Sequence, residues 1–233
     1  MLVFHYDIGG RVKNKTSWYH FLLLTLIIVS GLRYRIGIDT MVYTYEFYHS
    51  VPVINELDIE YLFEQKYEPG FLFLMSFVKS LGLRFYVVQI LQAIFVNVLV
   101  FKYVNKHCTY PFASIWLYTI WLFTYFNFEE MRSSMSVVIG LFGNDYVIKK
   151  KWIKGFLLYG ISMLFHYSAC LLFITPLFLF LRMNFLGYSF IFLSLIFGYI
   201  LNHYFGDIIS IFEFNSYMSD KASYYSDSDI YHL

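Results

Sequence analysis

Long runs without Asp, Glu, Lys or Arg divide the chain into apolar segments separated by short polar stretches. A transmembrane helix needs about 20 mostly apolar residues, with a range of about 17–25. By this criterion the pattern predicts five single crossings. They lie near residues 17–33, 85–104, 111–127, 131–148 and 184–205.

Two further apolar segments do not fit a single crossing. Residues 70–83 are short and are interrupted by Lys79, whereas residues 154–181 are long and carry His166 near the middle. Non-helical backbone at membrane depth is tolerated where it is buried in protein or lines a wet cavity. We therefore interpret both segments as broken or re-entrant elements that border a polar cavity.

Basic residues predict the orientation, because Lys and Arg in short loops favour the cytoplasmic side. Three basic clusters, at residues 11–15, 102–106 and 149–154, are placed inside, so the N-terminus is cytoplasmic. The acidic loop 34–69 and the acidic tail 206–233 are placed outside. These inside and outside assignments are consistent with one another under two conditions. Segment 70–83 must enter and leave on the outer face, and segment 154–181 must be a hairpin with its tip near His166.

The predicted fold is therefore all-α, a polytopic membrane helix bundle whose polar cavity opens to the outer face. Composition agrees, since the chain is 59% hydrophobic and 14% charged, against roughly 45–50% and about 25% in soluble domains. A net charge of +1 favours no nucleic-acid partner. No phosphate-binding glycine loop, hydrolase motif or metal-binding motif occurs, so we expect neither a cofactor nor a metal.

The polar residues that this topology places at the outer side are the candidates for chemistry. Charged side chains at membrane depth cost free energy, so their presence there indicates a function. The candidates are Arg33, Arg35, Asp39, Tyr43, Glu68, Glu129, Glu130 and Arg132, with His166 and Ser168 at the hairpin tip. Each has a simpler interpretation. The first two arginines could extend to lipid headgroups, and Asp39 and Glu68 could cap helices. The 129–132 stretch could be a solvated turn, and the histidine could be a satisfied core residue.

Four motifs in order resemble the EpsG/Wzy-type polysaccharide polymerases of bacterial O-antigen, capsule and exopolysaccharide synthesis. The first is R-Y-x-x-G-x-D-x-x-x-Y, matched from Arg33 through Asp39 to Tyr43. The second is a helix start of the type E-P-G-F, matched at 68–71. The third is an arginine followed by small residues, at 132–136, in a helix that ends in lysines. The last is F-H-x-S-A, matched at 165–169.

The resemblance implies a glycosyltransferase that joins undecaprenyl-diphosphate-linked repeat units at the outer face of the bacterial inner membrane. It implies that Arg33, Arg132 and the less regular Arg35 bind the diphosphate. His166 would be the base, with Asp39 and Glu68 as rivals for that role or as groups that orient an arginine. Tyr43, Glu129, Glu130 and Ser168 are further cavity candidates. Partners would be the lipid-linked glycan and the bilayer, with a flippase and a chain-length regulator as further partners.

Family members carry another helix before the arginine motif and more helices after a large outer loop. We therefore expect a chain truncated at both ends. Two alternatives stay open: an inactive or partial fragment of such a polymerase, and a transporter of polysaccharide precursors. A transporter would predict internal repeat symmetry, which the sequence does not show.

Overall fold

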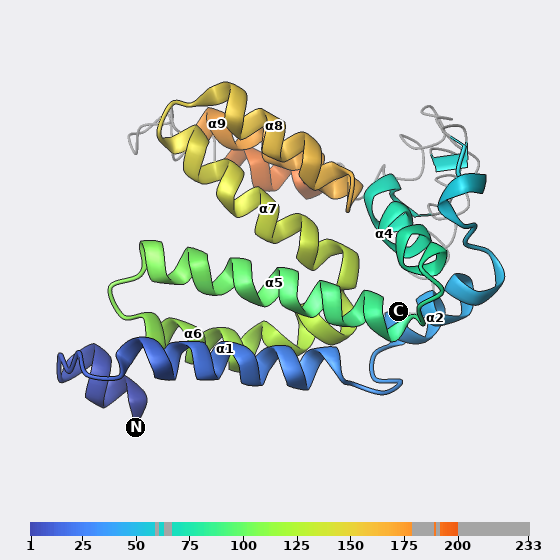
Figure 1. The fold of residues 1–233 in the computed structure, drawn as a ribbon. Helices are drawn as coiled ribbons and strands as arrows, with labels where there is room; N and C mark the ends of the chain where they lie inside the picture. Colours follow the sequence, from blue (N-terminus) through green and yellow to red (C-terminus); the bar gives the residue numbers. More distant parts are fainter. Residues whose placement is uncertain (59–60, 63–66, 179–188, 190–191, 200–233) are drawn as a thin grey trace, which may run out of the picture. The chain divides into compact units, whose positions relative to one another are not determined.

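The computed structural model describes residues 1–58, 61–62, 67–178, 189 and 192–199, and within them the regular structure is helical, without a strand. The chain divides into two compact units, which are Met1–Pro176 and Leu177–Leu233. The elements (Figure 1) are η1 (Val3–Ile8), α1 (Lys15–Gly31), α2 (Ile38–His49), η2 (Ile54–Glu56), α4 (Pro69–Ser80), α5 (Tyr86–His107), α6 (Pro111–Trp121), η3 (Tyr125–Glu129), α7 (Met131–Ile148), α8 (Trp152–Met163), η4 (Tyr167–Ile174) and α9 (Thr175–Phe178). The predicted all-α class is confirmed.

Four helices occupy the positions predicted for crossings. They are α1, α5, α6 and α7, although α6 ends at Trp121 and continues as the π-helical turn η3. The fifth predicted crossing, 184–205, lies mostly outside the described residues, of which 192–199 are helical. Within the described part of the chain, α5 is the one helix both long and apolar enough to cross a bilayer. The number of crossings therefore stays a prediction.

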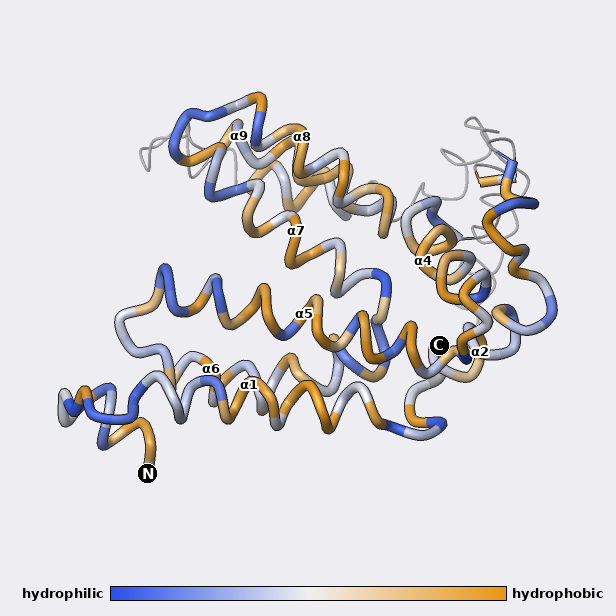
Figure 2. Tube along the Cα trace, viewed as in Figure 1, coloured by the Kyte–Doolittle hydropathy of each residue, from blue (hydrophilic) through white to orange (hydrophobic). Residues whose placement is uncertain are grey.

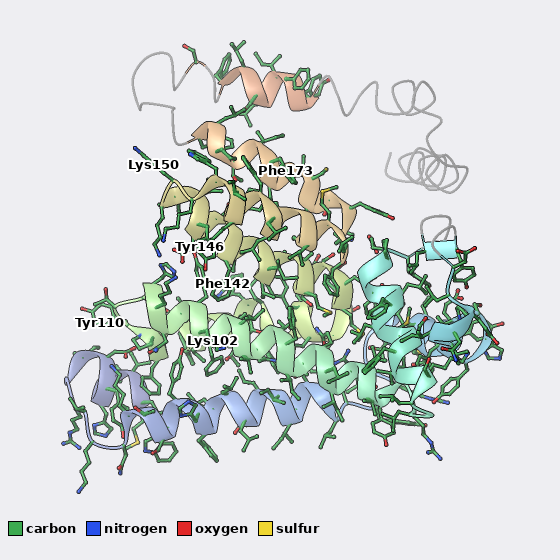
Figure 3. All side chains as sticks on the ribbon, turned by 45° about the horizontal axis from the view of Figure 1, so that its top comes forward. Lys102, Tyr110, Phe142, Tyr146, Lys150 and Phe173 are labelled. Atoms are coloured by element: carbon green, nitrogen blue, oxygen red, sulfur yellow. The ribbon has the colours of Figure 1, made fainter. Side chains whose placement is uncertain are left out.

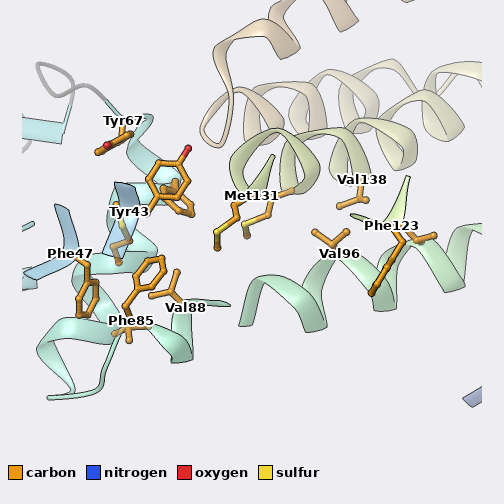
Figure 4. Close-up of a cluster of buried hydrophobic side chains, with 14 of the residues drawn as sticks. Tyr43, Phe47, Tyr67, Phe85, Val88, Val96, Phe123, Met131 and Val138 are labelled. Atoms are coloured by element: carbon orange, nitrogen blue, oxygen red, sulfur yellow. The ribbon is translucent and has the colours of Figure 1, made fainter. Parts of the chain in front are cut away.

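The central helix α5 packs along α1 and meets α7 on another side (Figure 1). A cluster of buried apolar side chains fills the space between these helices and α2, α4 and η3, as Figure 4 shows for part of it. Phe142 of α7 points toward α5 (Figure 3), where its ring meets Tyr103 edge-on with centroids 5.7 Å apart. Much of α1 and α6 is hydrophobic (Figure 2). Some of their large hydrophobic side chains are exposed, including Trp18, Ile28, Trp116 and Trp121.

A buried hydrogen-bond network of two asparagines and a tyrosine joins α5, α6 and η3. The apolar core alone would not specify how these elements are arranged. Asn97 of α5 donates to Asn127 of η3 at 2.9 Å, and Tyr118 of α6 donates to Asn97 at 3.1 Å. Asn127 in turn donates to the Tyr118 hydroxyl at 3.1 Å. Buried polar groups are costly unless they are paired, so this ring favours one arrangement of α5, α6 and η3.

Of the two segments predicted as broken or re-entrant, 70–83 forms one short helix, α4, and 154–181 is interrupted near His166 in its described part, which ends at residue 178. The 12 residues of α4 reach about 18 Å at 1.5 Å per residue, short of a hydrocarbon core about 30 Å thick. Helix α8 ends at Met163, His166 is extended, and η4 follows. The chain then runs back along α8, with Phe173 (Figure 3) stacked on Phe156 at 5.7 Å. The reversal at His166 agrees with the predicted hairpin tip, while its depth in a membrane stays a prediction.

Candidate functional site

Glu68 lies where α4 begins and holds two other predicted site residues. Pro69 fills the first helical turn, and Glu68 occupies the N-cap position in an extended conformation, but its side chain caps nothing. One carboxylate oxygen forms an ion pair with Nη1 of Arg132, and the other lies 2.9 Å from Nδ1 of His166. The capping role considered for Glu68 is therefore wrong, and the carboxylate bridges the cation and the imidazole.

Gly70 explains how α4 reaches the turn that carries His166. Its backbone N–H donates to the carbonyl oxygen of Leu164 at 2.7 Å, and a Cβ at this position would collide with the same carbonyl group. Glycine permits such close approach of two backbones. The Glu-Pro-Gly sequence thus starts a helix, supplies a carboxylate and brings both against the 164–166 turn.

Arg132 connects this bridge to α2. Its Nε donates to the hydroxyl oxygen of Tyr43 at 2.8 Å, and that hydroxyl donates to Asp39 at 2.8 Å. The guanidinium also lies over the Tyr43 ring, 5.4 Å from its centroid. Asp39 is not the N-cap, as the sequence had favoured, because α2 begins at Ile38 with Gly37 as its cap. Its carboxylate instead ends a hydrogen-bonded series that runs through Tyr43, Arg132 and Glu68 to His166.

The two carboxylates of this series have opposite pKa shifts. Burial raises the pKa of Glu68, but the hydrogen bond from His166 and the charge of Arg132 outweigh burial, so the pKa is lowered. Burial dominates at Asp39 and raises its pKa, although the hydrogen bond from Tyr43 and the charge of Arg132 oppose this effect. Glu68 is therefore the more firmly ionised carboxylate, and both of its oxygens are engaged.

Arg33 lies in the same region but has a different setting. It is buried, donates to the carbonyl of Ser30 at 2.7 Å and to Thr40 at 3.2 and 3.3 Å, and lies over the ring of Phe128. No described carboxylate forms an ion pair with it. Thr40 precedes Tyr43 by about one turn of α2, so buried Arg33 and half-buried Arg132 both donate hydrogen bonds to that helix.

The remaining predicted residues lie outside the bridged series. Arg35 is exposed and lies over the Tyr34 ring, 5.3 Å from its centroid. Glu129 is exposed, and Glu130 accepts a hydrogen bond from Ser133 at 2.7 Å at the start of α7. Ser168 is exposed but lies close to His166. The structure does not bring Arg35 to the cluster, although it lies within the arginine motif, two residues after Arg33.

A cavity of about 220 Å³ opens beside His166, between α7 and η4. Its polar lining includes Ser133, Ser136 and Ser168. Ser133 is absent from the predicted site residues, although it follows Arg132 directly in the motif that carries the resemblance. Across the part of the chain that the structure describes, no group of three or more His, Cys, Asp or Glu side chains could hold a metal ion.

Comparison with known proteins gives one match. Residues 17–232 match the model of a family described as the EpsG family. No curated protein and no solved structure matches the chain. The match covers all four motifs and every residue of the bridged series.

Proposed function

The chain belongs to the EpsG family of polysaccharide polymerases, and on this premise we propose that it joins lipid-linked oligosaccharide repeat units at the outer face of the bacterial inner membrane. The product would be an O-antigen, a capsule or an exopolysaccharide. The observation that carries the assignment of residues is the Glu68 bridge, which holds Arg132 and His166 at one site. The three residues come from three separate motifs.

In the proposed reaction, an acceptor sugar hydroxyl attacks the anomeric carbon of a glycan bound to undecaprenyl diphosphate. The new bond joins the acceptor oxygen to that carbon. The bond from the carbon to the diphosphate oxygen breaks, and its electron pair leaves with the lipid diphosphate. The hydroxyl proton passes to a base. The protein must therefore hold a base close to the acceptor and a cation close to the leaving group.

Arg132 suits the leaving diphosphate. Guanidinium is permanently charged and offers several donors in one plane, which matches phosphate oxygens. Nε and Nη1 are used by Tyr43 and Glu68, which fix the plane of the group. Nη2 has no partner among the residues that the structure describes, so it can donate to a ligand. In this proposal Arg33, which is buried and donates hydrogen bonds to Thr40, stabilises α2.

His166 suits the base. A carboxylate that accepts from one imidazole nitrogen fixes the tautomer and leaves the other nitrogen to accept a proton. Glu68 lies 2.9 Å from Nδ1, so Nε2 is the proton acceptor in this proposal, and the imidazole borders the cavity. Glu68 itself is a weak candidate for the base, since its pKa is lowered by His166 and Arg132 against the effect of burial. Its proposed role is to position both groups.

The membrane arrangement is part of the proposal. Arg132 lies in the first turn of α7 and Lys149 follows its end, so a helix that crosses inward would place the bridged series outside and the lysines inside. The exposed apolar side chains on α1 and α6 support contact with lipid. In a chain whose free Cys108 and Cys170 are replaced by serine, single cysteines introduced at 149–154 should react with an impermeant maleimide only after the membrane is opened. Labelling of these positions in intact cells would contradict this orientation.

The test of function is complementation of a polymerase-null strain, read as a polysaccharide ladder on a gel. Glu68→Gln keeps the shape of the side chain but loses the charge that holds Arg132 and His166. Misplacement of catalytic groups costs about a hundredfold in rate, so we expect the ladder to shrink to a few bands at equal protein level. The control is Glu56→Gln, an exposed carboxylate in η2. A full ladder from Glu68→Gln would contradict the proposal.

A further inference from the structure

The cavity beside His166 continues as a groove along α7. Ser133, Val137, Leu141 and Asn144 all line it, and their spacing of four, four and three residues places them on one face of a helix. The distance from the first to the last is 11 residues, or about 16 Å at 1.5 Å per residue. The opposite wall comes from η4.

The character of the groove changes along its length. At the end beside the bridged series it is lined by His166, Ser133 and Ser168, and Ser133 adjoins Arg132 in the chain. Farther along, the walls are mostly apolar, with Val137 and Leu141 on one side and Leu171 and Leu172 on the other. Asn144 lines the far end, but its side-chain oxygen already accepts hydrogen bonds from Tyr159 and Thr175. A ligand that fills the groove must therefore be polar at the end beside His166 and mostly apolar along the rest.

Gly140 determines how close the two walls lie. A Cβ at this position would overlap a methyl group of Leu172, so the missing side chain lets η4 approach α7. The outer rim stays open, because Leu171 is 63% exposed and Val137 is also exposed. A long flexible chain could thus enter from the side without passing through the protein.

We propose that this groove binds the first isoprenoid units of the lipid that carries the glycan. The inference rests on the proposed function, because it takes Arg132 as the site of the diphosphate. The prenyl chain is bonded directly to the diphosphate. A diphosphate bound at Arg132 therefore places the first apolar carbons of the chain beside Ser133 and Val137. The volume of about 220 Å³ is smaller than the roughly 300–1,000 Å³ of sites for drug-sized ligands. Only the first units are therefore held.

Sugar is the less suitable occupant of the apolar part. Hydroxyl groups buried without hydrogen-bond partners lose the free energy of their hydration, and the side chains at positions 137, 141, 171 and 172 offer no partner. The direction of the groove also favours lipid. Under the proposed orientation it begins at the outer end of α7 and runs toward Lys149, which is the direction in which the prenyl chain enters the hydrocarbon core.

The test uses a geranyl diphosphate analogue with a diazirine on its terminal isoprene and the full chain in lipid nanodiscs. Leu171→Trp fills the groove from its rim, and we expect at least tenfold less photolabelling together with loss of label on α7 and η4 peptides. Leu157→Trp is the matched control, because it is the same substitution on α8 at a residue that is 64% exposed and lies outside the groove. Labelling of that variant should equal the unmodified protein. Val137→Trp repeats the test from the other wall.

Two results would overturn the inference: unchanged labelling in both groove variants, or label spread over α1 and α6. Arg132→Ala separates the two proposals, because inorganic diphosphate should compete with the probe for the unmodified protein and for Leu157→Trp but not for Arg132→Ala. Suppose that Leu171→Trp and Val137→Trp lose labelling while Arg132→Ala keeps both labelling and competition. Then the lipid groove is supported and Arg132 is not the site of the diphosphate. If Leu171→Trp and Val137→Trp label normally while Arg132→Ala loses competition, Arg132 is supported as the diphosphate site and the groove proposal is wrong.

Discussion

Helix α7 carries one charged cluster near each end, and the two have similar composition in different settings. At its start, Arg132 joins Glu68 and His166. Near its end, Asp145 joins Lys106, His107 and Lys149. In each cluster one carboxylate contacts a histidine and a basic side chain, which is Arg132 in the first and two lysines in the second. Residue types alone would therefore assign both the same chemistry.

Their surroundings differ. The Lys106 and Lys149 side chains are 47% and 48% exposed, whereas that of Arg132 is 17% exposed. Lys149 lies one turn from Asp145 and Lys106 lies 39 residues from it, whereas Glu68 lies 64 residues from Arg132 and 98 from His166. The carboxylates of both clusters are buried, but an ion pair whose cation is exposed contributes little, because water solvates that charge almost as well as its partner does. A less exposed cation and a position beside a cavity distinguish the cluster to which we assign chemistry.

The largest expected difference between the clusters comes from removing the main cation of each. Arg132→Ala deletes the proposed diphosphate donor and leaves the buried Glu68 without its ion partner, so we expect polymer synthesis to fall about a thousandfold. Lys106→Ala should change it less than about twofold, since Asp145 keeps His107 and Lys149. Synthesis is measured as labelled polysaccharide at equal protein level. Equal losses would remove the distinction between the clusters.

The two histidines give the next comparison. His166→Gln keeps a polar side chain beside Glu68 but cannot accept a proton, and general-base catalysis typically contributes at least about a hundredfold. We expect a loss of that size at equal protein level. His107→Gln, in the cluster around Asp145, should retain full synthesis. Full activity of His166→Gln would transfer the role of base to Asp39.

The smallest expected effect is on stability in acid. A carboxylate whose folded pKa is lowered stabilises the protein fully above its unfolded pKa of about 4.3, and that contribution is lost as pH falls through the folded value. Glu68 has a lowered pKa because His166 and Arg132 outweigh burial. The gap in unfolding temperature between the unmodified protein and Glu68→Gln should therefore be constant from pH 7 to about 5 and narrow below about 4.

Differences of about 2–4 °C per kcal/mol are expected for a chain of this size, which a thermal scan in detergent can detect. For Asp39 the effect of pH on stability has the opposite sign, because burial raises the pKa of its carboxyl group. Its ionisation costs stability as pH rises through the raised value, so Asp39→Asn should lose no stability through this effect at neutral pH. A gap for Glu68→Gln that widened in acid would contradict the lowered pKa.

Local features of the fold were predictable from the sequence because their causes are local. Apolar runs predicted α1, α5 and α7 within a few residues, and the Glu68-Pro69 signal predicted the start of α4. The break at His166 was predicted from charge placement. The asparagine network of Asn97 and Asn127 was not predicted, because both residues lie within apolar runs and nothing local shows that they face each other.

The candidate site was predictable as a set of residues but not as a geometry. Sequence named Arg33 and Arg132, with Arg35 as the less regular candidate, as ligands of the diphosphate. In the structure Arg33 is buried against neutral groups, Arg35 is exposed, and Arg132 is held between Tyr43 and Glu68. Ser133 was missed, although a polar residue one position after a motif arginine, on the face that continues to Val137 and Leu141, is a usable signal.

The sequence by itself determined the helices, their approximate ends, the family and the candidate residues, because hydrophobic periodicity, proline and motif order are properties of neighbouring residues. Only the tertiary structure decided which candidates meet. Glu68 reaches Arg132 and His166 because Gly70 lets α4 approach the 164–166 turn while α7 packs against α5. Those contacts join segments far apart in the chain, and their free energy depends on packing and burial that no single segment carries.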